Sequence, residues 1–344
     1  MSTPEITYND ILAPNYGVTG IRRDAGDGGP VVITGGYPPG AGAKLQWMLY
    51  RGPLSPTDTT GYVSLVPSFP GQQVTTSNFY GPNTSLFNPE MGAGNIRVVG
   101  SYKYSGGPKG DLGLMYQGAL DGSGTWTPIV VPNDVAGGTV ANTLCHSTMG
   151  DLVVGNYDVQ GRPTSGTGFI YNVKTQTYTP LAVGKLATAY GIWQNAGSGS
   201  SSYTITGGYV ADGDLNTGFL LNYDSETGAV TDLTSLSYKG EAGIVTHFEG
   251  ITGVPGGFSL VGMYLAGQGS SEHLGVFIAR VPRHDDGSFG PATWLEIHNP
   301  DSGRIITGNS ILENSLIGLY PVKGGLQSYV ATVSDQVDAT GKGQ

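Results

Sequence analysis

Ile205-Thr206-Gly207-Gly208-Tyr209 is one of six segments in which a β-branched or aliphatic pair is followed by Gly-x-Tyr. The other five segments are Ile33-Thr34-Gly35-Gly36-Tyr37, Val98-Val99-Gly100-Ser101-Tyr102, Val153-Val154-Gly155-Asn156-Tyr157, Leu260-Val261-Gly262-Met263-Tyr264 and Leu316-Ile317-Gly318-Leu319-Tyr320. Successive tyrosines of this motif are 65, 55, 52, 55 and 56 residues apart. The spacing indicates an array of six units, each slightly longer than the commonest propeller repeats.

The fourth unit shows how a repeat is built. It contains four short apolar or alternating runs, at Thr188–Trp193, Tyr203–Tyr209, Gly218–Tyr223 and Val230–Leu233. The last two runs are separated by Asp224–Gly228, whose residues are typical of a hairpin loop. Four antiparallel strands per repeat correspond to one blade of a β-propeller.

The other units divide in the same order, with two remainders. The sixth unit has no fourth strand after Val333, and the N-terminal run Glu5–Tyr8 has no unit of its own. An N-terminal strand at residues 5–11 that completed the last blade would close the ring and cover an exposed edge. The strands expected to line the centre of the ring are Tyr16–Ile21, Ser77–Pro82, Leu144–Met149, Tyr190–Gln194, Thr246–Ile251 and Ile305–Ser310.

The sequence therefore predicts an all-β, six-bladed β-propeller with four antiparallel strands per blade, its last blade closed by the N-terminal strand. Residues 1–344 form a single domain in this interpretation. The approximate blades are 13–70, 71–135, 136–185, 186–240, 241–300 and 301–335 plus the N-terminal strand. A seven-bladed ring and a pair of β-sandwiches are the competing folds, but six Gly-x-Tyr motifs leave little sequence for a seventh blade.

Composition limits the partners. The formal net charge is −10 and the chain has no run of Lys or Arg, so nucleic acid is a poor candidate. No window reaches the roughly 18–20 apolar residues of a membrane span, so no membrane association is expected.

Cys145 is the single cysteine, which excludes an intrachain disulfide and a cysteine-cluster metal site. The first residues do not have the pattern of a signal peptide. The cellular compartment is therefore not predicted, and a secretory location is expected only if a leader preceded these residues.

The motif itself has a structural interpretation. Glycine suits a place where a strand bends or packs closely, and tyrosine suits an amphipathic position between blades. Candidate site residues are therefore sought on the inner strands, because the loops and strands around the central channel usually hold the ligand of a propeller.

His247 and Glu249 are two residues apart on one predicted inner strand, so they share a strand face and the carboxylate can orient or charge the imidazole. With Tyr190 they are the candidate catalytic groups, as general acid and base. The alternative is that they are hydrogen-bonded groups of the channel wall. The candidate substrate-binding residues are Asn78, Tyr80, His146, Trp193, Gln194 and Phe248. His273, His284 and His298 lie in or near predicted loops and are expected to be solvated.

No metal or cofactor is expected, because the chain has no His-Glu-x-x-His motif and no calcium-binding loop. Glu249 is nearly alone among carboxylates of the inner strands, so a glycosidase would have to recruit Asp151, Asp158 or Glu241. Aromatic faces with neutral hydrogen-bonding groups suit a flat, largely apolar ligand with a few oxygens. They suit a sugar ring against Trp193 equally well.

The six-unit array, the single-domain length and the aromatic, hydroxyl-rich channel resemble the β-propeller hetero-Diels–Alderases of fungal tropolone-sesquiterpenoid biosynthesis. The resemblance covers the chain as architecture. It implies a cofactor-independent enzyme of secondary metabolism that joins a tropolone-derived quinone methide to a terpene alkene in the channel, with Tyr80, Tyr190 or His247 polarising the enone oxygen.

Two other functions compete. The first is a non-catalytic glycan-binding propeller, and the second a propeller glycoside hydrolase or lyase with scattered acids. The units agree at Gly-x-Tyr but diverge on the inner strands, where Trp193 has no counterpart at His146 or Glu249. Divergence favours one central site over six peripheral ones. The expected partner is a small, largely apolar molecule, and no obligate protein partner is evident.

Overall fold

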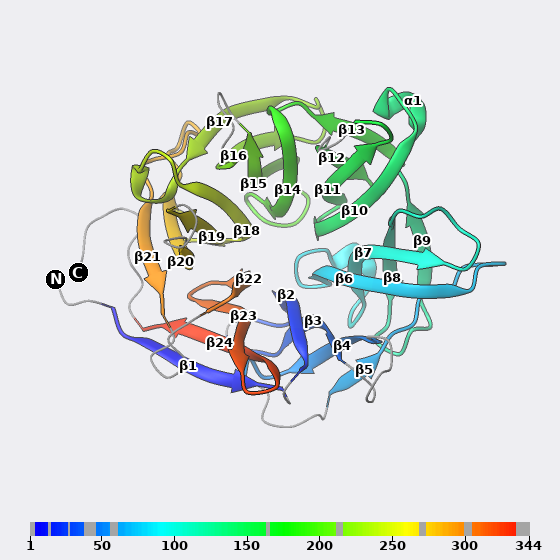
Figure 1. Cartoon of the computed structure of the whole chain (residues 1–344), viewed down its shortest axis with the longest axis horizontal. Helices are drawn as coiled ribbons and strands as arrows, with labels where there is room; N and C mark the ends of the chain where they lie inside the picture. The colour runs from blue at the N-terminus through cyan, green and yellow to red at the C-terminus, as the bar shows by residue number, and fades with distance from the viewer. Residues whose placement is uncertain are drawn as a thin grey trace.

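The computed structural model describes residues 4–12, 15–26, 28–37, 46–55, 61–162, 166–210, 216–267, 273–298 and 305–334. Over these residues, six four-stranded antiparallel sheets stand side by side in a ring (Figure 1). Each sheet is one blade. The structure is all-β apart from short helical turns, and the predicted six-bladed β-propeller is confirmed.

In each blade, one strand faces the centre of the ring and a second strand pairs with its outer edge (Figure 1). The inner strands are β2 (Gly17–Arg23), β6 (Val74–Thr84), β10 (Val140–Met149), β14 (Lys185–Gln194), β18 (Val245–Val254) and β22 (Thr307–Leu312). The second strands are β3 (Val31–Tyr37), β7 (Ile96–Tyr104), β11 (Leu152–Val159), β15 (Ser202–Val210), β19 (Gly257–Ala266) and β23 (Ser315–Val322). Each predicted inner segment coincides with or overlaps one of these inner strands.

Two further strands complete each blade toward the rim. The third strands are β4 (Gln46–Gly52), β8 (Leu112–Gly118), β12 (Thr167–Asn172), β16 (Asn216–Asp224), β20 (His273–Pro282) and β24 (Gly325–Val333). The outermost strands are β5 (Tyr62–Ser64), β9 (Thr125–Ile129), β13 (Thr177–Leu181), β17 (Val230–Leu236), β21 (Thr293–Ile297) and β1 (Ile6–Ile11). The helical turns are η1 (Pro89–Met91), α1 (Asn133–Ala136) and η2 (Tyr238–Gly240). In the part of the chain that the structure describes, no helix has the length and apolar character needed to cross a membrane.

Strand β1 closes the ring, as the sequence predicts. It pairs antiparallel with β24 in a register that runs from Ile6 opposite Val333 to Ile11 opposite Ser328. Ile11 is fully buried, and the Gln327 side-chain amide donates to the Ile11 carbonyl oxygen at 3.0 Å. The sixth blade therefore combines the two ends of the chain, and the outer edge of β24 is covered.

Every inner strand carries a β-bulge at the same level. In β14, Ala189 pairs with Gly207 and Gly191 pairs with Thr206, so Tyr190 is the extra residue. The extra residues in the other blades are Thr19, Tyr80 with Gly81, His146, Glu249 and Asn309. A bulge breaks the alternation of a strand and redirects a side chain. Each blade thus presents one redirected residue to the centre of the ring.

The glycine of the Gly-x-Tyr motif lies directly opposite the start of the bulge. A Cβ atom on Gly207 would lie 1.9 Å from the carbonyl oxygen of Thr188, which no side chain can tolerate. At the other five motif glycines the added Cβ would meet an inner-strand carbonyl oxygen at 1.8–2.4 Å. The predicted close packing of these glycines is confirmed, and the bulge is its physical cause.

The motif tyrosines pack where blades meet. Tyr264 stacks on Tyr238 of the connection between the fourth and fifth blades, with ring centroids 3.9 Å apart and an interplanar angle of 5°. Tyr102 stacks in the same way on Phe69 of the preceding connection, at 4.3 Å. Tyr102 and Tyr264 are buried, which accords with the structural interpretation of the motif.

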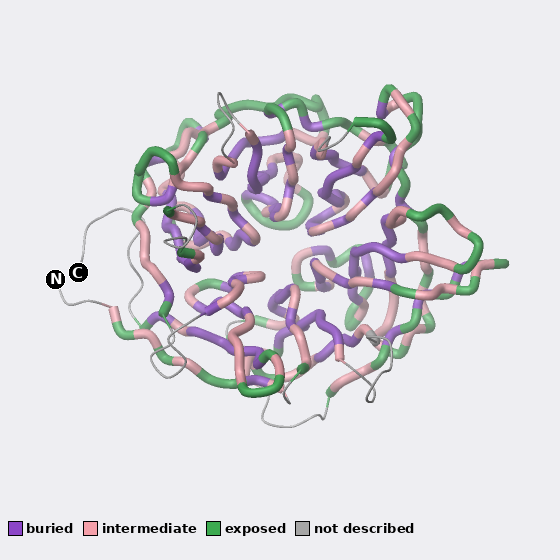
Figure 2. Tube along the Cα trace, in the orientation of Figure 1, coloured by how far each residue is buried: buried purple, intermediate pink, exposed green. Residues whose placement is uncertain are grey.

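The core lies between blades. One apolar cluster joins Met149 and Leu152 of the third blade to Ile192 and Phe219 of the fourth. Figure 2 shows the buried residues concentrated along the inner strands, with exposed residues at the rim and in the turns. Each blade therefore depends on its neighbours for burial of its apolar faces, as in other repeat folds.

The bulge contact predicts a large difference between two glycine substitutions. Gly207→Ala should lower the free energy of unfolding by about 3 kcal/mol, because its Cβ overlaps a carbonyl of the adjacent strand. Gly26→Ala is the matched control, since a Cβ there meets no atom within 4 Å. Denaturant unfolding of both variants measures the difference. Equal losses of stability would contradict this role of the motif glycine.

Candidate functional site

The six bulged residues surround a polar cavity of about 30 Å³ at the centre of the ring. Its lining includes one redirected side chain from each blade, namely Thr19, Tyr80, His146, Tyr190, Glu249 and Asn309. A cavity of this volume holds water or a very small ligand. Most organic ligands are too large to enter a cavity of this volume.

Two of the six residues join neighbouring blades. The Thr19 hydroxyl donates to the Phe79 carbonyl oxygen of the next blade at 2.7 Å. The Asn309 side-chain amide donates to the Val18 carbonyl oxygen across the closing junction at 2.5 Å. These bonds satisfy carbonyl groups that the bulges release from the ladder, so both residues have a structural role.

Aromatic rings from the other four blades form a continuous row. Tyr80 lies 5.2 Å from His146, His146 lies 4.7 Å from Tyr190, and Tyr190 lies 5.8 Å from His247, measured between ring centroids. The rings come from β6, β10, β14 and β18, so consecutive blades each contribute one. We call Tyr80, His146, Tyr190 and His247 the aromatic row. The structure thus brings together four of the predicted site residues.

Glu249 completes the site beside His247. Its Oε1 lies 2.7 Å from Nε2 of His247, and the His247 and Glu249 side chains are 25% and 17% exposed, so both can be reached from solvent. Burial lowers the pKa of His247, but the hydrogen bond and the charge of Glu249 outweigh it and raise the pKa above its ordinary value of 6.5. The sequence-based expectation of a His247–Glu249 pair is confirmed.

Glycine at the middle position of the fourth motif makes room for this pair. A Cβ on Gly208 would lie 2.7 Å from the Cβ of His247 in the next blade. In the second and third motifs the middle residue is polar and contacts a side chain of the inner strand instead. Ser101 accepts a hydrogen bond from the side-chain amide of Asn78 at 3.2 Å, and Asn156 Oδ1 lies 2.8 Å from Nε2 of His146.

His146 has the opposite electrostatic setting to His247. Burial lowers the pKa of His146, and the opposing effects of the hydrogen bond to Asn156 and the charge of Glu249 are too small to reverse it. The imidazole is therefore neutral at pH 7. With Nε2–H donating to the Asn156 carbonyl oxygen, Nδ1 is left as an acceptor.

The two tyrosines of the row are hydrogen-bond donors at neutral pH. Burial raises the pKa of Tyr190 to about 12, and the negative charge of Glu249 acts in the same direction. Burial also raises the pKa of Tyr80, with a further contribution from Asp111. Neither phenol is activated as a nucleophile, since an activated phenol requires a lowered pKa.

Three predicted binding residues lie elsewhere. Phe248 is fully buried and stacks on Trp294 inside the fifth blade, because it lies between His247 and Glu249 and therefore points to the opposite face of the strand. Gln194 is 5% exposed, and its side-chain amide donates to the Ser200 carbonyl oxygen at 2.7 Å. Trp193 lies beyond the cavity, at the far end of β14.

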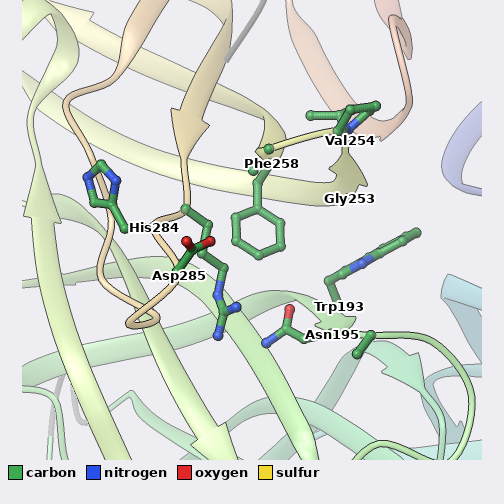
Figure 3. A pocket seen from close by; sticks show the side chains of 12 residues that line it. Trp193, Asn195, Gly253, Val254, Phe258, His284 and Asp285 are labelled. Carbon is green, nitrogen blue, oxygen red and sulfur yellow. The ribbon is translucent and has the colours of Figure 1, made fainter. Parts of the chain in front are cut away.

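Trp193 belongs to a second, larger pocket of about 620 Å³ between the fourth and fifth blades. Figure 3 shows its indole beside Asn195, with Phe258, His284 and Asp285 on the other side of the pocket. Phe87 packs edge-on against the indole, with ring centroids 5.5 Å apart. We call this the blade 4–5 pocket.

Several contributors to the central site were not found from the sequence. Thr19, Asn309 and the buried Arg22 line the cavity, Asn156 contacts His146, and Ser101 accepts a hydrogen bond from Asn78. A signal existed for the last two, because both are the middle residue of a Gly-x-Tyr motif. Among the described residues, no group of three or more His, Cys, Asp or Glu side chains is placed to hold a metal ion.

Comparison with known proteins identifies the fold. No protein-family model and no curated protein sequence matches the chain. Among solved structures, a protein of unknown function from Dyadobacter fermentans aligns over 96% of this chain and 100% of its own, with 11% identity and a TM-score of 0.53. Trypanosoma rangeli sialidase, solved with sialic acid, aligns over 96% of this chain and 56% of its own, with 9% identity and a TM-score of 0.51. Identities this low show a shared propeller fold alone.

The opposite settings of the two histidines predict separate titrations by NMR. His247 should titrate above pH 6.5 and His146 below it. In Glu249→Gln, the pKa of His247 should fall below 6.5, because burial then acts without the carboxylate. Glu90→Gln, which removes an exposed partner of Lys174, is the control and should leave both titrations unchanged.

The His247–Glu249 pair also predicts how the stability of the protein changes with pH. A histidine whose pKa is raised on folding stabilises the protein fully below its unfolded pKa, and this contribution is lost as the pH rises through the folded pKa. The stability lost in Glu249→Gln should therefore be greater at pH 5.5 than at pH 8.5. A loss that is equal at both values would contradict charging of His247.

Proposed function

We propose that the protein is a small-molecule enzyme that binds a flat, oxygen-bearing ligand against the aromatic row and activates it with His247. The observation that carries this proposal is the 2.7 Å contact between His247 and Glu249 at the end of the row. Because Nε2 of His247 is bound to Glu249, the Nδ1–H of the imidazolium is the donor available to a ligand oxygen. A charged donor of this kind strengthens as negative charge develops on that oxygen.

The second histidine supports an acid–base assignment. The pKa of His247 is raised by Glu249 and that of His146 is lowered by burial, although Tyr190 alone separates them in the row. Environments that push two pKa values apart define an acid and a base. His247 thus serves as the acid, His146 Nδ1 as the acceptor, and the Tyr190 hydroxyl as a neutral donor between them.

Within this class, the specific reaction that we propose is the hetero-Diels–Alder cycloaddition implied by the resemblance. A quinone methide and a terpene alkene combine with no atom gained or lost, as one C–O and one C–C bond form. Donors that bind the heterodiene oxygen lower the barrier, and the aromatic faces hold the two reactants together. The central cavity admits neither reactant, so both would bind in the mouth over Tyr80 and Tyr190.

Tropolone is a suitable first probe of the central site. We expect native mass spectrometry and calorimetry to show one bound tropolone, and Tyr190→Phe to weaken binding about three- to tenfold through loss of one hydrogen bond. His247→Gln should weaken it further, because the lost donor is charged. Tyr157→Phe changes a motif tyrosine outside the cavity and should bind as the unmodified protein does.

Turnover is measured by adding a quinone methide precursor and a macrocyclic terpene alkene and following adduct formation. His247→Gln should lower kcat more than it raises KM, because the donor acts mainly in the transition state. Absence of tropolone binding, or variants that bind it unchanged, would reject the central site as the ligand site.

Glycan binding at the blade 4–5 pocket is the second candidate. The indole of Trp193 and the polar groups of Asn195, Arg283 and Asp285 line one cavity of sugar size. Hydrolysis is less well supported, because a glycosidase needs two opposed carboxyl groups. Among described residues, Glu249 is the one carboxylate lining the central cavity and Asp285 the one lining the blade 4–5 pocket.

Sialic acid and neutral oligosaccharides test this candidate. If the pocket binds sugars, Asp285→Asn should change their affinity at least threefold, whereas Asp134→Asn on the exposed turn α1 should not. Tryptophan fluorescence and calorimetry give the affinities. Sugar binding that Asp285→Asn leaves unchanged would remove the blade 4–5 pocket from consideration.

A further inference from the structure

Arg22 is a buried cation without a counter-charge in the described structure. It lies on β2, is 5% exposed and lines the central cavity. Its Nε donates a long hydrogen bond of 3.4 Å to the Pro82 carbonyl oxygen. Among described residues, its remaining N–H groups have no hydrogen-bond acceptor, and no carboxylate lies within 4.0 Å.

In the other buried arginines, both terminal amino groups have a partner. Arg23 forms an ion pair with Glu313 at 3.0 Å. Arg97 donates to the Gln117 side-chain oxygen at 2.9 Å, and Arg280 donates to the Asn314 side-chain oxygen at 2.6 Å. Arg22 alone among these four leaves both terminal amino groups without a partner in the described residues.

The guanidinium crosses the channel. Its carbon lies 5.7 Å from the ring centroid of Trp193, which belongs to β14 on the opposite side of the ring from β2 (Figure 1). The indole face stabilises the positive charge in part. It accepts no conventional hydrogen bond in the plane of the guanidinium, where the free N–H groups point.

The charge itself persists at neutral pH. Burial lowers the pKa of Arg22 to about 10, with no carboxylate acting in the opposite direction. Glu249 lines the same cavity, but its Oε1 is engaged by His247. A cation that is 5% exposed and has no carboxylate partner among the described residues favours an anion close to its N–H groups.

We propose that the central cavity is an anion-binding site in which Arg22 binds one compact anion. The cavity of about 30 Å³ limits that anion to a halide or to the carboxylate head of a small organic molecule. The Arg22 guanidinium is the binding group. The proposal does not rest on catalysis at His247, because its binding group is Arg22.

Bromide provides a direct test in the full chain. At constant ionic strength, replacing gluconate by bromide should raise the Tm of the unmodified protein by about 2 °C through binding to the folded state. Arg22→Met should lose this rise. Arg162→Met, which changes an exposed arginine, should keep it. Anomalous diffraction from crystals grown in bromide should place one bromide in contact with the Arg22 guanidinium.

The diffraction measurement stands even if Arg22→Met fails to fold. Acetate distinguishes the two sources of the anion. If acetate raises the Tm more than bromide and displaces the bromide peak, the natural occupant is a carboxylate, and otherwise it is a free halide. No peak at Arg22 together with no bromide-specific rise in Tm would overturn the proposal.

Discussion

A close contact between a glycine and a carbonyl group, repeated in six blades, is the constraint on which this structure depends. The inner strand of each blade bulges, and the second strand must pass its carbonyl without a side chain. In exchange, the bulge turns one residue of each blade toward the centre. The motif that marks the fold in the sequence is therefore also the reason that a central site exists.

Six equivalent positions do not give six equivalent roles. Thr19 joins the first blade to the second and Asn309 joins the sixth to the first, whereas the residues of the second to fifth blades provide rings and a carboxylate. The site is consequently one-sided. An approximately symmetric scaffold thus carries chemically different side chains at its six equivalent positions.

The sequence was sufficient for the fold and for part of the site. The repeat spacing identified six blades, and the unpaired run Glu5–Tyr8 identified the closing strand. Period-two alternation placed His247 beside Glu249 correctly. The structure places Phe248 and Trp193 outside the central site, because Phe248 lies between His247 and Glu249 on the opposite face of β18 and Trp193 lies in the blade 4–5 pocket. The arrangement of Arg22 opposite Trp193 depends on ring closure across two blades and has no local signal.

The closing strand also orders the events of folding. β1 is made first, yet its partner β24 ends at Val333, so β1 has to wait unpaired while the other blades are synthesised. The entropic cost of closing so long a loop grows only logarithmically with its length. Pairing of β1 with β24 is therefore favourable once both strands exist. Until then the junction between the first and last blades is open, and its apolar faces, including Ile11 and Val330, are accessible to a chaperone or to another copy of the chain.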